Sequence, residues 1–451
     1  MLGRRLKLWA GRMALARRLE RALPPAALAL MGALADAGHE VGLVGGCVRD
    51  LLLDVAPRDW DIVTSAGPEA ILAMFPEGRL MGAARGGNTV LIPREGAAYE
   101  VTPYRAPDLL GDLGRRDFTI NAMALGMDVT LHDPLGGQAD LARGVVRACL
   151  DPGERLREDP LRMLRAVRLA AQLDFALDPA LEEAITSLAP LLDTVAPERV
   201  GAEFARLLVT DRPAAGLEQL RALGLLERFA PELLAGVGMA QNQYHAYPVW
   251  EHCLMALALV PPELHLRLAA LLHDIGKPRS LSTDEQGNRH FYRHELIGAE
   301  MASVLLERLR FENETRRRVV HLVRYHMDLH MDGPVSDSAI RRMIGRIGLE
   351  HMHDLIQVRR ADRLASGKRE GDLSPETVYL LQQVERVLAE DAALKVTDLA
   401  VTGEDVLAVF GRPPGPYVGQ VLGQLLDEVL EEPGRNTREH LLVRLAELSQ
   451  L

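Results

Sequence analysis

Strand-like segments in this sequence are confined to its first third. Short apolar or alternating runs occupy residues 41–44, 60–64, 89–93 and 98–104. A helix is predicted at 25–39, ended by Gly38, and another at 48–54. After about residue 145 the apolar residues follow helical spacing. The sequence has no repeat with a period of about 20–50 residues, which disfavours a solenoid. The pattern predicts an α+β fold, with an α/β head followed by an all-helical remainder.

The composition excludes several classes of protein. A chain of 451 residues is too long for one hydrophobic core, so we expect several folding units. Its three cysteines lie far apart and form no C-x-x-C pair, which disfavours a disulfide framework or a zinc knuckle and fits a reducing cytoplasm. A net charge of −11 argues against a uniformly basic surface but not against a local basic groove.

The N-terminal stretch MLGRRLKLWAGRMALARRLE resembles a secretory leader only in its basic start. Arg12, Arg17 and Arg18 interrupt every apolar run, and no small-residue cleavage site follows. We interpret residues 1–24 as a basic amphipathic helix. No stretch of the sequence is apolar and long enough to cross a bilayer, so we expect a cytoplasmic protein without a membrane partner.

Two features of the head could hold a nucleotide. Gly45 and Gly46 stand between a predicted strand and a predicted helix, where paired glycines let the backbone approach an anion, although a plain tight turn has the same pattern. Asp59 and Asp61 would point to one face of a strand and repel each other unless a cation lies between them. A solvated strand edge is the alternative, which the apolar residues after Asp61 weaken. Together the two features favour a two-Mg²⁺ site for a triphosphate.

Three sequence blocks carry a more specific resemblance. GGCVRDLLL with RDWDIVT, then RRDFTINAMAL at 115–125, then EDPLRMLRAVRLAAQLDF at 158–175 occur in this order. They resemble the class II tRNA nucleotidyltransferases and bacterial poly(A) polymerases. The resemblance implies a nucleotidyltransferase head followed by a helical neck, body and tail. It also implies tRNA and CTP as substrates, together with ATP in members that complete the CCA end.

The resemblance assigns roles to single residues of the head. Asp59 and Asp61 would bind the catalytic Mg²⁺ ions, one activating the 3′ hydroxyl of the RNA and the other holding the triphosphate and the leaving pyrophosphate. Glu100 is either a third ligand or a surface residue on the polar side of an alternating strand. The nucleotide would be contacted by Gly45, Gly46, Arg49, Arg116, Asp117 and Asn121.

An enzyme that adds C or A without a template must read the base itself. Both bases present an amino donor beside a ring-nitrogen acceptor, which a neighbouring carboxylate and arginine can bind. Glu158, Arg162 and Arg165 are spaced to share one face of a helix with Pro160 in its first turn. This spacing alone is typical of a surface Glu–Arg pair. The resemblance implies that Asp159 and Arg162 read the base edge, while Glu158 holds Arg162 in place.

The segment before the RRDF block is short, covering only residues 106–114. Relatives that add the full CCA carry a longer flexible segment here, which helps their pocket switch from CTP to ATP. A short segment is the mark of relatives that add only two cytidines. We therefore expect CC addition, with a separate A-adding enzyme acting afterwards. Full CCA addition is the alternative, with Arg85-Gly86-Gly87-Asn88 as a substitute moving element.

The second half of the chain contains an ordered set of metal-ligand residues. A His-Asp doublet with a distant His and Asp can form an octahedral N/O site. The stretch LLHDIGKP at 271–278 resembles the HD phosphohydrolase superfamily. The resemblance implies a site for one divalent transition metal or Mg²⁺, formed by His252, His273, Asp274 and Asp362. His294 and His326 match the extra ligands of two-metal HD proteins, although satisfied helix histidines are the alternative. Such a domain would hydrolyse phosphoesters, including 2′,3′-cyclic phosphates.

The sequence therefore predicts five segments, separated in part by a polar linker at 366–375. They are an N-terminal helix (1–24), a nucleotidyltransferase head (25–146), a neck and body with the base-reading helix (147–240), an HD domain (241–365) and a tail that would bind tRNA (376–451). A poly(A) polymerase would share the head but would usually lack the HD domain. A non-catalytic RNA-binding protein is disfavoured because Asp59, Asp61, Asp159 and Arg162 are all present.

Overall fold

The computed structural model describes residues 13–81, 88–329, 336–368, 375–389 and 395–450. The chain divides into two compact units, Met1–Phe229 and Ala230–Leu451, and each is described by itself. The predicted N-terminal helix is present over residues 13–22. Three predicted features lie wholly or partly outside the described residues: the start of that helix (1–12), most of the substitute moving element (85–87) and most of the linker (369–374).

A seven-stranded sheet forms the head, in the order β3-β4-β5-β2-β1-β6-β7. Strands β2 and β5 run parallel, and the other neighbours are antiparallel. The four predicted strands are present, whereas the three shortest were too brief to show an alternating pattern. The strands are β1 (Val41–Val44), β2 (Asp61–Thr64), β3 (Arg79–Leu80), β4 (Val90–Arg94), β5 (Ala97–Pro103), β6 (Ala124–Gly126) and β7 (Leu131–His132).

Alternating residues of the strands pack on opposite faces of this sheet. Leu43 and Ile62 belong to the main core, with residues of α2 (Pro25–Asp36), α3 (Gly46–Leu52) and α4 (Pro68–Met74). Val44 and Val63 face the other way and pack with Leu113 of α5 (Leu109–Gly114). The remaining short elements of the head are η2 (Thr119–Asn121) and α6 (Gly137–Arg143).

Strand β2 begins at Asp61, so the prediction that Asp59 lies on the same strand is wrong. Strand β1 pairs with β2 through Leu43 and Ile62. The chain then turns at Gly45 into α3, so β1 supplies no ladder partner for Asp59. Asp59 therefore lies in a bend before the strand.

The rest of the first unit is helical. Its elements are α7 (Pro152–Glu158), α8 (Arg162–Leu173), α9 (Pro179–Leu188), η3 (Ala189–Thr194), α10 (Pro197–Leu208), α11 (Pro213–Ala222) and α12 (Leu226–Phe229). Helices α10 and α11 both pack on α8. A short parallel ladder of β8 (Val145–Val146) and β9 (Ala176–Leu177) was not predicted from the sequence.

The prediction that Glu158, Arg162 and Arg165 share one helix is wrong. Helix α7 ends at Glu158, Asp159 has extended backbone with φ −148° and ψ 97°, and α8 starts at Arg162. The residue before a proline avoids helical backbone. Pro160 therefore breaks the helix at Asp159 instead of occupying its first turn.

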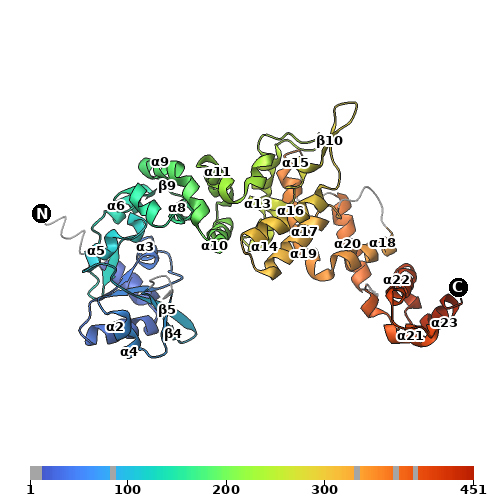
Figure 1. The fold of residues 1–451 in the computed structure, drawn as a ribbon, viewed down its shortest axis with the longest axis horizontal. Helices are drawn as coiled ribbons and strands as arrows, with labels where there is room; N and C mark the ends of the chain where they lie inside the picture. Colours follow the sequence, from blue (N-terminus) through green and yellow to red (C-terminus); the bar gives the residue numbers. More distant parts are fainter. Residues whose placement is uncertain (1–12, 82–87, 330–335, 369–374, 390–394, 451) are drawn as a thin grey trace. The chain divides into compact units, whose positions relative to one another are not determined.

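The described residues of the second unit are mostly helical, and they include one hairpin, which was not predicted. Strands β10 (Leu281–Thr283) and β11 (Arg289–Phe291) form this hairpin, which projects from the helices in Figure 1. The HD part contains η4 (Pro231–Gly236), α13 (Val249–Leu259), α14 (Leu264–Leu272), α15 (Lys277–Ser280), α16 (His294–Arg308), α17 (Asn313–Tyr325), α18 (Asp337–Ile347), α19 (Leu349–Ala365) and α20 (Pro375–Ala389).

The C-terminal helices form a separate apolar cluster around Val406, Leu425 and Leu441. Their bounds are η5 (Val396–Asp398), α21 (Gly403–Phe410), α22 (Pro416–Glu431), η6 (Pro433–Arg435) and α23 (Arg438–Leu448). Within the described part of the chain, every helix is too short or too polar to span a bilayer. The predicted α+β class, a small-sheet head followed by helices, is confirmed.

Candidate active sites

The first candidate site begins where β1 ends. Gly45 has a φ of 83°. A Cβ at this position would lie 3.2 Å from Asp61 Oδ2 and 3.3 Å from Arg116 Nη1. Because the backbone conformation and the close approach both disfavour a side chain, glycine lets the turn lie directly beside a carboxylate and a guanidinium.

Three carboxylates gather near this turn. Asp61 and Glu100 are register partners on the parallel strands β2 and β5. Burial and the charge of Glu100, with a smaller contribution from Asp59, raise the pKa of Asp61 to about 6 although Arg116 opposes the shift. The repulsion would be relieved by a divalent cation, and carboxylate oxygens are ligands that Mg²⁺ prefers. The donor set therefore fits the predicted Mg²⁺ site, and the ligand role of Glu100 stays a prediction.

A chain of polar contacts connects α3 with α8. Arg49 Nη1 donates to Asn121 Oδ1 at 2.8 Å, and Asn121 Nδ2 donates to Asp117 Oδ1 at 3.3 Å. Arg165 Nη1 contacts Asp117 Oδ2 at 3.0 Å. Burial would raise the pKa of Asp117, but Arg165 and Asn121 hold it below its ordinary value. Four predicted nucleotide-binding residues thus form one connected and charged network.

The predicted base-reading residues lie at the break between α7 and α8. Arg162 Nη1 donates to Glu158 Oε2 at 3.0 Å, so the predicted contact exists although the helix is broken. Asp159 does not pair with Arg162 through its side chain, because Asp159 Oδ2 accepts from Arg199 Nη2 at 2.9 Å. The base-reading roles of Asp159 and Arg162 stay predictions.

Two residues of α10 belong to this site and were missed in the sequence. Arg199 holds Asp159, as described above, and Glu203, which is 3% exposed, pairs with Arg165 at 3.7 Å and Arg168 at 2.7 Å. The only local signal is the i, i+4 spacing of Arg199 and Glu203. That spacing does not reveal which other helix the two side chains face.

The second candidate site is a buried cluster in the HD part. His252 Nε2 lies 3.0 Å from His273 Nε2, 3.4 Å from Asp274 Oδ2 and 3.2 Å from Asp362 Oδ1. His294 Nε2 lies 3.3 Å from Asp274 Oδ1 and 3.2 Å from His326 Nε2. The structure thus brings together all six predicted ligands, which are 0–8% exposed: His252, His273, Asp274, His294, His326 and Asp362.

The orientation of the imidazoles indicates a cation. Nδ1 of His273, His294 and His326 lies 2.7–2.8 Å from the carbonyl oxygens of Ala270, Phe291 and Val323. Nδ1 must carry the proton there because a carbonyl only accepts. The two Nε2 lone pairs of His294 and His326 then face each other at 3.2 Å, which is unfavourable unless a proton or a metal lies between them. Histidines that bind a metal usually donate their other ring N–H to a carbonyl or a carboxylate in this way.

The charge of the cluster also favours a cation. Burial alone would lower the pKa of His273, but Asp274 and Asp362 raise it to about 10. Buried carboxylates that stabilise an added proton this strongly would also stabilise a divalent ion. The residues present therefore fit the metal site that the sequence predicted.

Two further residues of this site were not identified from the sequence. His245 and His252 can present ligand atoms within 4.8 Å of Asp274. Lys277 Nζ lies 2.6 Å from Asp274 Oδ2. Lys277 is part of LLHDIGKP, so the motif itself contained a signal, whereas His245 lies in an irregular segment without one.

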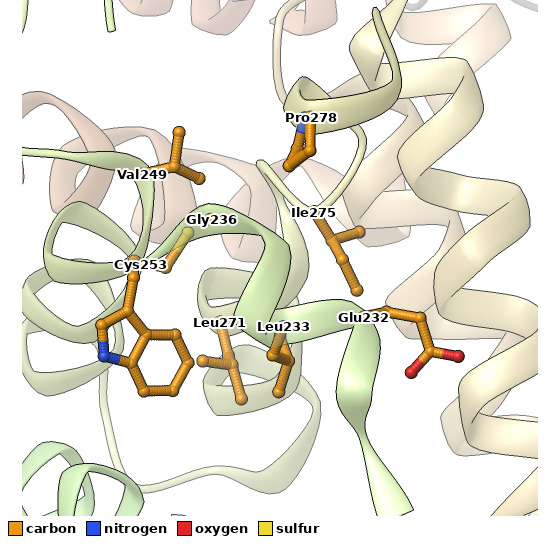
Figure 2. Close-up of a pocket in the computed structure, with 9 residues that line it drawn as sticks. Glu232, Leu233, Gly236, Val249, Cys253, Leu271, Ile275 and Pro278 are labelled. Atoms are coloured by element: carbon orange, nitrogen blue, oxygen red, sulfur yellow. The ribbon is translucent and has the colours of Figure 1, made fainter. Parts of the chain in front are cut away.

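An apolar layer lies beside the cluster. Figure 2 shows Leu233, Cys253, Leu271 and Ile275 around one small space, together with Glu232 at its side. The cavity measures about 10 Å³, which is room for one water at most. It is therefore part of the packing behind the metal ligands and is too small for a substrate.

Comparison with known proteins agrees with this geometry. The family model of the poly A polymerase head domain matches residues 41–147, the one described as "probable RNA and SrmB- binding site of polymerase A" matches 174–236, and that of the HD domain matches 244–367. The fold is similar to the crystal structure of the Bacillus stearothermophilus CCA-adding enzyme in complex with CTP. The TM-score is 0.71 at 29% identity, covering 94% of this chain and 97% of that one.

Curated relatives match along most of their length. The chain is 37% identical to the A-adding tRNA nucleotidyltransferase of Deinococcus radiodurans, covering 85% of this chain and 90% of the relative. It is 38% identical to the CC-adding tRNA nucleotidyltransferase of Thermus thermophilus, covering 86% and 89%. It is 30% identical to the CCA-adding enzyme of Limosilactobacillus reuteri, covering 92% and 94%. With a head, an RNA-binding part and an HD domain in this order, the chain is an enzyme that belongs to the tRNA nucleotidyltransferase family.

Proposed function

We propose that this enzyme adds two cytidines to the 3′ end of tRNA from CTP. The 3′ hydroxyl oxygen would attack the α-phosphorus, the bond from that phosphorus to the bridging oxygen would break, pyrophosphate would leave, and the hydroxyl proton would pass to solvent. Mg²⁺, when bound, neutralises the triphosphate and lowers the pKa of the hydroxyl. The observation that carries the proposal is the carboxylate of Asp61 beside the Gly45 turn, with the charges of Glu100 and Asp59 acting on it.

The residues of the head would have separate roles in binding the ions, the phosphates and the ribose. Asp59 and Asp61 would hold the ions, with Glu100 as a third ligand. Arg116, beside Gly45, would meet the phosphates. Arg49 would hold Asn121, and through it Asp117, in one orientation for the ribose.

Base selection would take place at the break between α7 and α8. Arg162 is 14% exposed in its side chain, and Glu158 and the carbonyls of Arg155 and Arg115 already orient its guanidinium. The long contact of Nη2 with the Arg115 carbonyl, at 3.4 Å, is the one that a base would replace. Asp159 would accept from the exocyclic amino group of cytosine. Its bond to Arg199 sets the position of the carboxylate before the nucleotide arrives.

The short segment at residues 106–114 supports CC addition over full CCA addition. Asp108 caps α5 by accepting from the Gly111 amide at 2.8 Å, and Leu113 is fully buried. Asp112 accepts from Arg105 and pairs with Arg116. A segment anchored at its start, middle and end does not supply the moving element that a switch to ATP needs. Sequence identity does not separate CC addition from A addition, because an A-adding relative and a CC-adding relative match this chain almost equally well.

The decisive experiment is to incubate the full chain with tRNA that lacks its CCA end, with CTP alone, ATP alone, or both. We expect two added residues with CTP and no third residue when ATP is present. A third residue would overturn CC addition in favour of CCA addition. Extension of tRNA ending in CC by ATP alone would show an A-adding enzyme.

We also propose that the neck and the tail hold the tRNA. A match to an RNA-binding family model over residues 174–236 supports this role for the neck. The tail begins two of its helices at Gly403 and Pro416, and Thr402, Gly403 and Gly415 line one groove beside these helix starts. Deletion of residues 395–451 should weaken tRNA affinity in a filter-binding assay, and unchanged affinity would exclude the tail.

A second activity, metal-dependent phosphoester hydrolysis, is favoured by the opposed imidazoles of the HD cluster. The boundaries that we propose for this domain are residues 241–365. The double substitution His273→Ala with Asp274→Ala should remove bound metal and hydrolysis of 2′,3′-cyclic nucleotides, and should spare nucleotide addition. Loss of nucleotide addition in a folded double variant would contradict two separate sites.

A further inference from the structure

An irregular strap, residues 239–248, is fixed beside the HD cluster. Gln241 Oε1 accepts from Lys277 Nζ at 2.6 Å, and Lys277 pairs with Asp274. The amide of Ala246 donates to the carbonyl of Ser366 at 2.8 Å. The strap is thus attached on one side to a metal-ligand partner and on the other to the end of α19.

The β10–β11 hairpin is attached to the same cluster. The carbonyl of Phe291, at the end of β11, accepts from Nδ1 of the ligand His294 at 2.8 Å. Lys277 Nζ lies 5.5 Å from the centre of the Phe291 ring. Arg289 of the hairpin donates to the carbonyl of Ala240. Strap and hairpin therefore form one connected border of the metal site.

This border carries most of the exposed tyrosines of the protein. Tyr292 is 69% exposed, Tyr244 53% and Tyr247 38%. Among the described residues one other tyrosine is exposed, Tyr379 on α20 at 44%. Aromatic residues are only 4% of the sequence, so three exposed rings on two adjoining segments need a reason other than chance.

The ring of Tyr292 is already part of a stack. Its plane is 5° from that of His290, with the ring centres 5.3 Å apart. His290 is itself held by Asp284 at 3.0 Å. The outer face of a fixed, exposed ring is the platform on which a nucleobase stacks.

Positive charge accompanies the aromatic rings. Arg293 is exposed and lies between Tyr292 and the ligand His294, with a φ of 61° that few non-glycine residues adopt. Exposed Lys368 donates to the carbonyl of Gln243 on the strap at 2.9 Å. In a chain with a net charge of −11, this local pairing of aromatic rings and cations is the chemistry that binds single-stranded nucleic acid.

We propose that the strap and the hairpin form a stacking surface for the bases of single-stranded RNA whose terminal phosphate enters the HD cluster. The inference rests on the proposed phosphoesterase activity of that cluster and adds its substrate class. Tyr292 and Tyr244 bind the bases, and Arg293 contacts the backbone phosphate. The cluster then cleaves a phosphoester at the RNA end, with water supplying the oxygen to phosphorus and a proton to the leaving alcohol.

The test compares Tyr292→Ala and Tyr244→Ala with the control Tyr379→Ala in the full chain. The substrates are a trinucleotide that ends in a 2′,3′-cyclic phosphate and glycerol 2-phosphate, which has no base. We expect the KM for the trinucleotide to rise about tenfold in the two strap and hairpin variants, with little change in kcat. Hydrolysis of glycerol 2-phosphate and the behaviour of Tyr379→Ala should not change, and Tyr292→Phe should restore the wild-type KM.

A binding measurement separates failure of this inference from failure of the phosphoesterase proposal. Fluorescence anisotropy of a labelled trinucleotide with a 3′-phosphate, in EDTA, requires no hydrolysis. If the wild type hydrolyses nothing, the phosphoesterase proposal fails, and about tenfold weaker binding by Tyr292→Ala still supports the stacking surface. Equal binding by Tyr292→Ala and Tyr379→Ala would overturn it, as would an equal loss of hydrolysis on the substrate without a base.

Discussion

Replacing Asp61 by asparagine should stabilise the metal-free protein while abolishing nucleotide transfer. Burial and the charge of Glu100, with Asp59 in addition, raise the pKa of Asp61 to about 6 from an ordinary value of 3.8. Below pH 3.8 the Asp61 carboxyl is protonated in both the folded and the unfolded chain, so it does not lower the free energy of unfolding. Between pH 3.8 and pH 6 the unfolded chain ionises this carboxyl group while the folded chain keeps it protonated, so stability falls across this range and the loss is complete above pH 6. The variant therefore gains its full advantage above pH 6.

The size of the gain follows from the shift. A difference of about two pKa units corresponds to about 3 kcal/mol, which is an upper limit because Asp61 is partly accessible to solvent. We expect about 1–2 kcal/mol at pH 8, which would raise the unfolding midpoint of a unit of this size by about 2–6 °C. At pH 5, between the two pKa values, the gain should be about half as large.

Calorimetry of the full chain in EDTA at pH 5 and pH 8 measures this effect. The control is Asp211→Asn, which changes an exposed aspartate of the same unit. Glu100→Gln should raise the unfolding midpoint by part of the amount expected for Asp61→Asn. The variant with both substitutions should gain less than the sum of the two, because the two carboxylates act on each other. Mg²⁺ should raise the midpoint of the wild type and not that of Asp61→Asn. A lower midpoint for Asp61→Asn at pH 8, or equal gains at both pH values, would refute the reasoning.

Three further substitutions test other parts of the two sites. Asp59→Asn should slow nucleotide incorporation by about a thousandfold in primer extension and leave tRNA affinity within about twofold, because RNA binding depends on phosphate contacts elsewhere; normal incorporation would exclude a metal role. Glu203→Gln should lower kcat/KM for CTP by about tenfold, because Arg165 loses a buried partner; unchanged steady-state kinetics would contradict the contribution of α10. His326→Ala should lower the metal content of the HD site, as measured by elemental analysis, and an unchanged content would show that His326 is no ligand.

The predictable features of the head are those with a local signal. Gly45 marked the turn because few other residues allow its backbone, and the strand at Asp61 followed from its apolar run. Asp59 was misplaced because the end of a ladder depends on where the partner strand turns away. The helix break at Asp159 was also readable in principle, since Pro160 follows it.

The features that escaped prediction join residues far apart in the chain. Arg199 and Asp159 are separated by 40 residues, and Lys277 and Gln241 by 36. In neither pair does the local sequence around one residue show which distant residue it will contact. The residues of the buried HD cluster were predicted to lie together in spite of similar separations, because His, Asp and the LLHDIGKP stretch have a chemistry-specific pattern, whereas Arg–Asp pairs occur on most protein surfaces.

The two candidate sites should differ in how they hold their ions. In the head, Asp59 and Glu100 are exposed, and all the donors are carboxylate oxygens, which suit Mg²⁺ that arrives with the nucleotide. In the HD cluster the predicted ligands are buried and four of them are imidazoles, which suit a transition metal such as Fe²⁺ or Ni²⁺. Brief dialysis against EDTA should therefore abolish nucleotide addition first and phosphoester hydrolysis later. After full removal of metal, Mg²⁺ alone should restore addition, and a transition metal should be needed for hydrolysis. Recovery of both activities at the same Mg²⁺ concentration would show that imidazole ligation does not select the ion of the second site.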